Sequence, residues 1–443
     1  MNPAAIENLL KIVLMDWAII IAVAWFFGRL GKRMGQPLAV GEILAGLLLG
    51  PSALGLIWPN NWPAIFPAEA QQSLQLLGKL GIVLLLFQVG MEFDYGHFRH
   101  QSRTVIGVSL MGMIAPMLGG LAIGPWLHNR FAPNTDYRGF QLYVCIALSI
   151  TALPILGRIL LEMKLERTAL GAMAVSAAAI DDVAGWIGLA VVTALSTSKF
   201  RWLPMFGQIA GVVIFFLFLV KVAGPALRKL WTKSIAHRER TDGGAMSASF
   251  MAILLIALFG CCLVTNRLGV YSIFGAFLLG VSLHKQADLV KAWRDQLSNF
   301  TLVALVPIFF TNTGRRTQIN SLNSGDAWLG CAAVLFVGAA GKLLGCWAAA
   351  RVGGLPNRAA ISIAALMNTR ALMGLIAINV GYELSLLPKD LFTIFVIMSL
   401  VTTAMTGPIL KIFLPAELRP LVPDYVAAEA RRTKRSRELS HAV

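Results

Sequence analysis

The sequence predicts an all-α protein that crosses a membrane many times. Apolar residues make up 57% of the chain and charged residues only 14%, whereas soluble domains carry about 25% charged residues. The mean hydropathy is +0.71, and the apolar residues gather in stretches long enough to cross a hydrocarbon core of about 30 Å. The formal net charge of +16 comes from Lys and Arg residues that fall mainly between those stretches. This pattern excludes a soluble enzyme and gives no reason to expect nucleic-acid binding.

Thirteen apolar stretches can be delimited, and each is predicted to be a membrane-spanning helix. The ninth and tenth are the shortest and have the least distinct ends. In chain order their approximate limits are 9–28, 38–57, 74–92, 104–127, 140–160, 168–195, 204–223, 247–265, 270–284, 298–312, 327–350, 359–381 and 391–414.

The positions of Lys and Arg predict how these spans are oriented. Of the 38 basic residues, 26 lie in the last turn of odd-numbered spans, after those spans or in the tail, and 8 lie after even-numbered spans. By the positive-inside rule the N-terminus is outside, the C-terminus is cytoplasmic, and the protein is expected in the cell inner (cytoplasmic) membrane. Arg315 and Arg316, on the outer side, are the main exception.

This orientation allows an internal symmetry. Spans 1–6 begin outside and spans 8–13 begin inside, so two inverted six-helix repeats joined by span 7 are predicted. Inverted repeats are a common plan for secondary transporters. The prediction is topological, because no residue-level repeat is visible in the sequence.

Two adjacent aspartates are the most informative residues of the chain. Asp181 and Asp182 lie in the middle of Thr168 to Leu195, a stretch with no other charge. Each ionised aspartate at the bilayer centre costs roughly 3 kcal/mol, and such residues usually mark an ion or proton pathway. A structural ion pair would need one carboxylate and one cation, so the second carboxylate favours a functional site.

Lys342 is the second key residue. It lies about eight residues from the cytoplasmic end of span 11, too deep for its ammonium to reach water easily. A buried lysine pairs with a carboxylate or loses its proton, so Asp181 and Asp182 are its expected partners. Close approach of the two helices is predicted from their small residues, which are Gly171, Ala172, Ala178, Ala179 and Gly185 on one and Gly338, Gly341 and Gly345 on the other.

Two spans in corresponding positions of the halves carry helix breaks. Span 5 has Thr151 three residues before Pro154, and span 12 has Asn368, Thr369 and Arg370 amid apolar residues. Proline removes a backbone hydrogen bond, and unwound backbone at the membrane midplane supplies carbonyl ligands and opposed helix dipoles for a cation. By contrast, the five cysteines show no metal-binding or disulfide spacing, and no cofactor is expected.

These motifs resemble those of the monovalent cation:proton antiporter superfamily, in the branch of bacterial Na⁺/H⁺ antiporters and plant cation/H⁺ exchangers. The resemblance covers nearly the whole chain, and its motifs stand in family order. They are Gln36 to Leu54, Leu80 to Asp94, Ser149 to Leu160, the IDDVAGW stretch, Gly341 with Lys342, and Asn368 to Gly381.

The resemblance assigns roles to individual residues. It implies that Asp182 binds the monovalent cation and the proton, and that Asp181 pairs with Lys342. It places Thr151 in the first crossing helix, and Asn368, Thr369 and Arg370 in the second, as ligands or helix-dipole partners. Related bacterial antiporters often have a glutamate after the second break, whereas this chain continues with Ala371 and leaves Arg370 without that neighbour.

The fold that the resemblance implies is a homodimer in which each protomer has a dimerisation domain and a mobile core. The predicted segments are dimerisation helices 1–3 in residues 1–103, core helices 4–6 in 104–200, linker helix 7 with a basic loop in 201–245, dimerisation helices 8–10 in 246–320, core helices 11–13 in 321–414, and a short basic cytoplasmic tail in 415–443. The tail is expected to lie against anionic lipid or to be disordered.

The expected function is exchange of Na⁺ and/or K⁺ for H⁺ by an elevator-like, alternating-access mechanism that moves net charge, in a protein that is not an enzyme. Two alternatives stay open. One is a channel-like potassium efflux system, for which a regulatory ligand-binding domain is expected and not seen in this chain. The other is an organic-anion symporter on the same fold, for which no anion site is evident.

Overall fold

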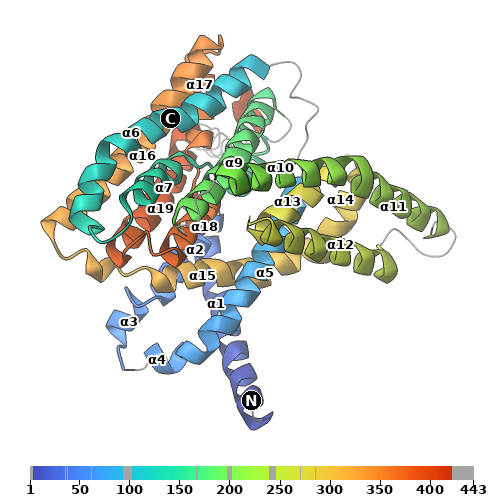
Figure 1. Ribbon diagram of the computed structural model, residues 1–443, viewed down its shortest axis with the longest axis horizontal. Helices are drawn as coiled ribbons and strands as arrows, with labels where there is room; N and C mark the ends of the chain where they lie inside the picture. The colour runs from blue at the N-terminus through green and yellow to red at the C-terminus, as the bar shows by residue number, and fades with distance from the viewer. Residues whose placement is uncertain are drawn as a thin grey trace, which may run out of the picture. The chain divides into compact units, whose positions relative to one another are not determined.

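A computed structural model describes residues 3–34, 36, 38–60, 62–92, 102–165, 168–196, 202–238, 246–269, 271–284 and 286–421. Over these residues the protein is all-helical, without a strand (Figure 1). The predicted fold class is therefore confirmed at the level of an all-helical protein. The RRTKRSR run of the predicted basic tail lies outside the described residues.

The chain forms two compact units. Unit 1 comprises Met1–Gly28, Gly41–Asp94 and Trp186–Leu322, and unit 2 comprises Arg29–Val40, Tyr95–Gly185 and Asn323–Val443. The helices of unit 1 are α1 (Pro3–Arg33, most of it), α2 (Leu38–Leu49), α3 (Leu54–Ile57), α4 (Trp62–Ile65), α5 (Ala68–Glu92), α10 (Trp202–Phe218), α11 (Gly224–Arg238), α12 (Ala248–Arg267), α13 (Ser272–Leu283), α14 (Ala287–Trp293) and α15 (Val306–Arg316). The helices of unit 2 are α6 (Ser102–Phe131), α7 (Tyr137–Ser149), α8 (Leu153–Glu162), α16 (Gly325–Val352), α17 (Asn357–Met367), α18 (Ala371–Glu383), α19 (Lys389–Phe413) and the first part of α9 (Ala169–Ser196).

Ten helices in the described part of the chain are long and apolar enough to cross a membrane, or eleven if one bent pair counts as a span. All thirteen predicted stretches contain helix, but two of them are not among these candidate spans. The fifth is divided into α7, of 13 residues, and α8, of 10 residues. The ninth is α13, which has only 12 residues. Apolar composition therefore located these stretches, while helix length distinguishes continuous spans from broken or short ones.

Side-chain caps explain where several helices begin. The first backbone N–H groups of a helix have no partner within it, and a carboxylate or hydroxyl just before the helix can accept from one of them. The side chain of Asp136 accepts from Gly139 N at the start of α7. Ser247 and Ser324 cap α12 and α16 in the same way.

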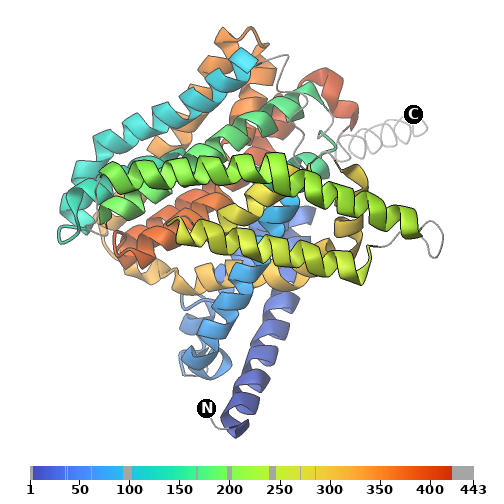
Figure 2. The same ribbon diagram turned by 45° about the vertical axis from the view of Figure 1, so that its right-hand side comes forward.

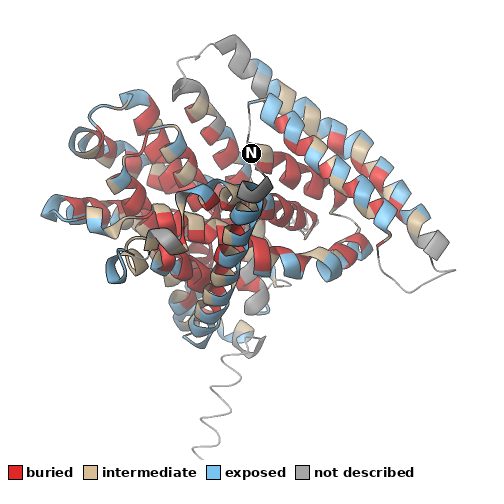
Figure 3. Ribbon diagram, turned by 90° about the horizontal axis from the view of Figure 1, so that it is seen from below, coloured by how far each residue is buried: buried red, intermediate tan, exposed pale blue. Residues whose placement is uncertain are grey.

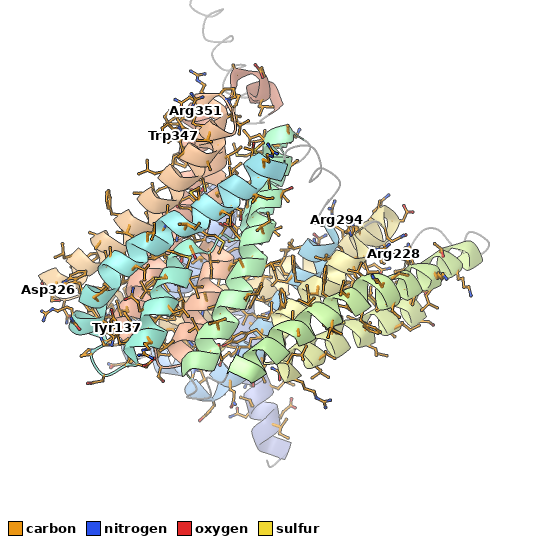
Figure 4. All side chains as sticks on the ribbon, turned by 45° about the horizontal axis from the view of Figure 1, so that its top comes forward. Tyr137, Arg228, Arg294, Asp326, Trp347 and Arg351 are labelled. Carbon is orange, nitrogen blue, oxygen red and sulfur yellow. The ribbon has the colours of Figure 1, made fainter. Side chains whose placement is uncertain are left out.

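In unit 2, α6 and α16 run side by side along their length (Figure 1). Asp326 lies at one end of α16 and forms an ion pair with Arg130 of α6, while Trp347 and Arg351 lie toward the other end (Figure 4). Between these ends, a Cβ atom on Gly341 would lie 2.9 Å from Cα of Pro116, so the backbones of the two helices are in contact.

The prediction that the glycines of α16 pack against α9 was wrong. A Cβ on Gly345 would overlap the carbonyl oxygen of Met111 on α6, and one on Gly338 would meet side chains of Leu148 and Met398. On α9, Gly185 faces Ile150. The small residues therefore do not bring α16 and α9 into contact. The long side chain of Lys342 links the two helices instead, because it reaches Asp181 on α9.

In unit 1, α10 and α11 join through a π-helical turn at Leu219–Ala223 into one long helix (Figure 2). The described residues of the α10–α11 helix and of α12 include exposed positions in successive turns (Figure 3). Many of these residues are large and apolar, for example Ile214 at 66%, Ile256 at 72% and Leu263 at 66% exposure. Apolar side chains exposed to this degree are suited to contact with lipid rather than water.

Arg315, an exception to the positive-inside pattern, is buried in unit 1. Its guanidinium donates to the carbonyl oxygen of Phe66 at 3.1 Å and lies 5.7 Å from the ring centroid of Trp62. Asp16 on α1 is wholly buried and within electrostatic reach of it. Arg315 is therefore not a loop charge of the kind that the rule counts.

The α6–α16 contact generates a prediction. Gly345→Ala should lower the thermal midpoint in detergent, because overpacking a tight contact costs about 1–3 kcal/mol and the new methyl group would meet the Met111 backbone. Gly260→Ala is the matched control, since it lies within α12 and nothing stands within 4 Å of a new Cβ. Equal thermal midpoints for the two variants would contradict the close contact.

Candidate functional site

The two helix breaks predicted from the sequence meet in unit 2. α7 ends at Ser149 and α8 begins at Leu153, while α17 ends at Met367 and α18 begins at Ala371. Pro154 has no backbone N–H, which suits the first turn of α8 and prevents a continuous helix from α7. Between the breaks, Ala152 N donates to the Thr369 carbonyl oxygen at 2.7 Å.

All seven site residues predicted from the sequence lie in unit 2, and each is at most 3% exposed. They are Thr151, Asp181, Asp182, Lys342, Asn368, Thr369 and Arg370. The site is therefore complete within one compact unit.

The carboxylate of Asp181 accepts three hydrogen bonds. Oδ1 accepts from the hydroxyl of Ser109 at 2.6 Å. Oδ2 accepts from the hydroxyl of Thr151 at 2.6 Å and from the ammonium of Lys342 at 2.7 Å. These donors come from α6, from the α7–α8 break and from α16, so one carboxylate ties three parts of unit 2 together.

Asp182, the next residue on α9, has a different environment. Its side chain is 3% exposed, and its Oδ1 has no hydrogen-bond partner among the described residues. The backbone N–H of Leu153, at the positive N-terminal end of α8, interacts favourably with this carboxyl group. Adjacent helix positions differ by about 100°, so the two carboxylates face different neighbours.

Two cations bind the C-terminal end of α7. Lys342 donates to the carbonyl oxygen of Ser149 at 2.6 Å, and Arg370 donates to that of Leu148. Arg370 also donates to the carbonyl oxygen of Gly338. The last carbonyls of a helix have no partner within it and carry partial negative charge, so cations are stabilised there. Arg370 thus binds carbonyl oxygens of both α7 and α16.

The remaining predicted residues, Asn368 and Thr369, lie in the second break and form hydrogen bonds there. The hydroxyl of Thr369, in the break, donates to the carbonyl oxygen of Leu366 in the last turn of α17 at 2.8 Å and does not reach the aspartates. Asn368 Nδ2 donates to the Thr402 carbonyl at 3.4 Å, while its Oδ1 is buried without a partner in the described part of the chain. At the start of α18, the hydroxyl of Thr403 accepts from the backbone N–H groups of Arg370 and Ala371.

Ser109 and Thr403 are site residues that the sequence analysis missed. Each is one of several hydroxyl residues in a mainly apolar helix, and such residues often only bond back to their own helix. The sequence offers no spacing rule that would select them. Their contacts follow from the packing of α6 against α16 and of α19 against the α17–α18 break.

The geometry makes the two aspartates chemically unequal. Asp181 is paired with Lys342 and accepts three hydrogen bonds. Asp182 is a buried carboxyl group with one oxygen that has no partner among the described residues, and this oxygen can accept either a proton or a dehydrated cation. Among the described residues there is no group of three or more His, Cys, Asp and Glu suited to a resident metal ion.

Comparisons with known proteins identify the family of the chain. Residues 18–416 match the family model "Sodium/hydrogen exchanger, transmembrane". The Na⁺/H⁺ antiporter NhaS4 of Synechocystis is 32% identical over 411 residues, which are 92% of this chain and 98% of that protein. Cation/H⁺ antiporter 20 of Arabidopsis thaliana is 31% identical over 91% of this chain, which spans about half (49%) of the plant protein.

The fold is also similar to that of a solved structure. The sodium proton antiporter MjNhaP1 of Methanocaldococcus jannaschii aligns with a TM-score of 0.65 over 91% of this chain and 96% of that one, at 15% identity. At that identity the likeness shows the fold alone. With the family match over residues 18–416 and the cyanobacterial relative over nearly its full length, the chain belongs to the sodium/hydrogen exchanger family of multi-pass membrane transporters, which are not enzymes.

Proposed function

We propose that the protein is a secondary active antiporter that exchanges Na⁺ and/or K⁺ for H⁺, with Asp182 as the shared binding residue. The observation that carries this proposal is the buried Oδ1 of Asp182, which has no hydrogen-bond partner among the described residues, beside Asp181, which accepts three hydrogen bonds. One carboxyl group cannot hold a proton and a cation together. Binding of the cation therefore expels the proton, and protonation expels the cation.

The neighbours of Asp182 support this role. Lys342 offsets the charge of Asp181, so the site as a whole can bear the one further negative charge that a monovalent cation neutralises. Asn368 offers a second buried oxygen without a partner among the described residues, and it is a candidate further ligand. Thr151 contributes indirectly, since its hydroxyl is committed to Asp181.

The two units suggest how the site reaches both sides of the membrane. Unit 2 contains the whole site and nearly corresponds to the predicted core, while unit 1 nearly corresponds to the predicted dimerisation domain with the linker helix. We propose thirteen crossings in two inverted repeats, with unit 2 moving in an elevator-like manner against unit 1. In this proposal the protein is a homodimer in the cell inner membrane, with its N-terminus outside and its basic tail near anionic lipid.

Transport assays in proteoliposomes test the function directly. With an imposed pH gradient, addition of Na⁺ or K⁺ should dissipate the gradient, and Li⁺ serves as a further comparison. A channel-like potassium efflux system would instead carry K⁺ without moving protons. Cation flux without proton movement would therefore overturn the antiport proposal.

Asp182→Asn should abolish cation-dependent proton movement, reducing it to the background of empty liposomes, because an amide neither releases a proton nor offers a full negative charge. Asp326→Asn is the matched control, since Asp326 is at the exposed end of α16, where an ion pair contributes only about 0–1 kcal/mol. A pH-sensitive dye measures both. Full exchange by a folded Asp182→Asn protein would refute the assignment.

The Asp181–Lys342 pair predicts a non-additive effect on stability. Lys342→Ala or Asp181→Ala alone should cost about 3–5 kcal/mol, because each leaves an uncompensated buried charge, and the double variant should lose less than either. Thermal unfolding in detergent compares the four proteins. Simple additivity of the two losses would show that the pair is not energetically coupled.

Transport should also carry net charge. Displacement of one proton from Asp182 and one from the Asp181–Lys342 pair exchanges two protons for one cation, and one charge moving through the membrane responds to voltage at about 2.3 kcal/mol per 100 mV. Recordings on solid-supported membranes should show a transient current after a cation jump. Clear proton movement without any current would indicate one-for-one exchange and refute the two-proton account.

A further inference from the structure

The helix α18 begins without a cap from its own N-cap residue. That residue is Arg370, whose side chain accepts no hydrogen bond from the first turn. A guanidinium group carries donors only, and it donates instead to the carbonyl oxygens of Leu148 and Gly338. Ser, Thr, Asp and Asn are the usual N-cap residues because their side-chain oxygen can accept. The first N–H groups of α18 therefore depend on an acceptor from another residue.

Thr403 of α19 supplies this acceptor. Its wholly buried hydroxyl accepts from the backbone N–H of Arg370 at 3.1 Å and from that of Ala371 at 3.0 Å. The same hydroxyl donates to the carbonyl oxygen of Ser399 in its own helix at 2.8 Å. A hydroxyl group has one hydrogen and two lone pairs, so these three bonds use all of them. One threonine thus caps a helix to which it does not belong.

Asn368 is a local competitor for the same two N–H groups. The side-chain oxygen of an asparagine readily accepts from the backbone N–H two or three residues further along the chain. For Asn368 these residues are Arg370 and Ala371. Yet its Oδ1 is buried without a partner among the described residues, because Thr403 accepts from both N–H groups.

The other end of the Asn368 amide group is held by the same helix, α19. Its Nδ2 donates to the carbonyl oxygen of Thr402 at 3.4 Å. A carbonyl oxygen only accepts, so the amide group turns its nitrogen toward α19 and leaves its oxygen on the other side. Thr402 thus binds the nitrogen of Asn368, and Thr403 binds the N–H groups that its oxygen would otherwise take.

We propose that Thr403 is a positioning residue that raises cation affinity by keeping Oδ1 of Asn368 free to bind the transported cation. The inference deepens the proposed function and rests on it. Without the Thr403 hydroxyl, two N–H groups of α18 lack an acceptor where water is scarce, and Asn368 turns its oxygen to them. The backbone of the break is anchored separately by the bond from Ala152 N to the Thr369 carbonyl oxygen, so a side-chain rotation is the smaller adjustment.

The first test is the KM for Na⁺ or K⁺ of cation-dependent proton movement in proteoliposomes. Thr403→Val keeps the shape of the side chain without the hydroxyl, and KM should rise about five- to tenfold, the scale of one lost polar contact. Thr403→Ser retains the acceptor and should keep KM near that of the wild type. Thr265→Val is the matched control, because the wholly buried Thr265 hydroxyl donates only to carbonyl oxygens of its own helix, and its KM should not change.

A double-mutant cycle tests whether Thr403 acts through Asn368. Asn368→Ala alone should raise KM, because it removes the oxygen that the proposal assigns to the cation. In a Thr403→Val background the same substitution should add little, because that oxygen is already withdrawn. Full additivity of the two effects would overturn the proposal, since it would show that the residues act independently.

The second test measures binding without transport. A cation that binds the folded protein raises its thermal midpoint as its concentration increases, and the dependence yields an apparent Kd. Na⁺ or K⁺ is titrated in detergent, with choline keeping the ionic strength constant. The apparent Kd should rise for Thr403→Val and stay near that of the wild type for Thr403→Ser and Thr265→Val. Thr403→Ala, which also lacks the acceptor, carries both tests if the valine variant is not folded.

The outcomes separate the two proposals. A merely structural role of Thr403 would lower the thermal midpoint without cation and leave KM and the apparent Kd unchanged, and this result would overturn the inference. Equal rises for Thr403→Val and Thr265→Val would overturn it as well. A wild-type protein with neither exchange nor a cation-dependent midpoint would overturn the proposed function itself, whereas wild-type exchange with an unchanged KM in Thr403→Val would overturn only the role of Thr403.

Discussion

The buried ion pair of Asp181 and Lys342 is the interaction on which the organisation of unit 2 depends. A charge inside a membrane protein is tolerated only when it is paired and hydrogen-bonded, because its desolvation is so costly. Asp181 meets this requirement with the ammonium and the hydroxyls of Ser109 and Thr151. α6, the α7–α8 break and α16 must therefore all lie within hydrogen-bonding reach of one carboxylate.

At both helix breaks, polar or charged side chains stabilise backbone groups that have no partner within a helix. Each break exposes carbonyl oxygens at one helix end and N–H groups at the next, in a region where water is scarce. Lys342 and Arg370 bind the carbonyl end of α7, and Thr403 caps the amide end of α18. Asp182 lies at the amide end of α8. The breaks thus create binding positions for charges of both signs, and at the breaks the carboxylate oxygen without a partner among the described residues is Oδ1 of Asp182.

Glycine contacts hold this arrangement together, because helices in lipid gain little from the hydrophobic effect and associate through close packing instead. In unit 2, Gly341 and Gly345 bring α16 against α6. In unit 1, Gly81 of α5 meets the backbone at Leu305, and the backbones of α2 and α15 approach at Gly46 and Gly314. Both units are therefore assembled through backbone contacts that larger side chains would prevent.

The sequence by itself determined the apolar helices, the buried aspartate pair, the deep lysine and the two breaks, because hydropathy, charge and the Pro154 position are local properties. Tertiary structure decided the rest. Asp181 and Asp182 are neighbours in sequence, but successive helical positions point about 100° apart. Packing therefore gives Asp181 three hydrogen-bond donors and leaves Oδ1 of Asp182 without one among the described residues. Ser109 looked like any serine in an apolar helix, and the glycines of α16 gave no sign of which helix they would contact. These assignments depend on how α6 packs against α16, which is a contact between helices that lie far apart in the sequence.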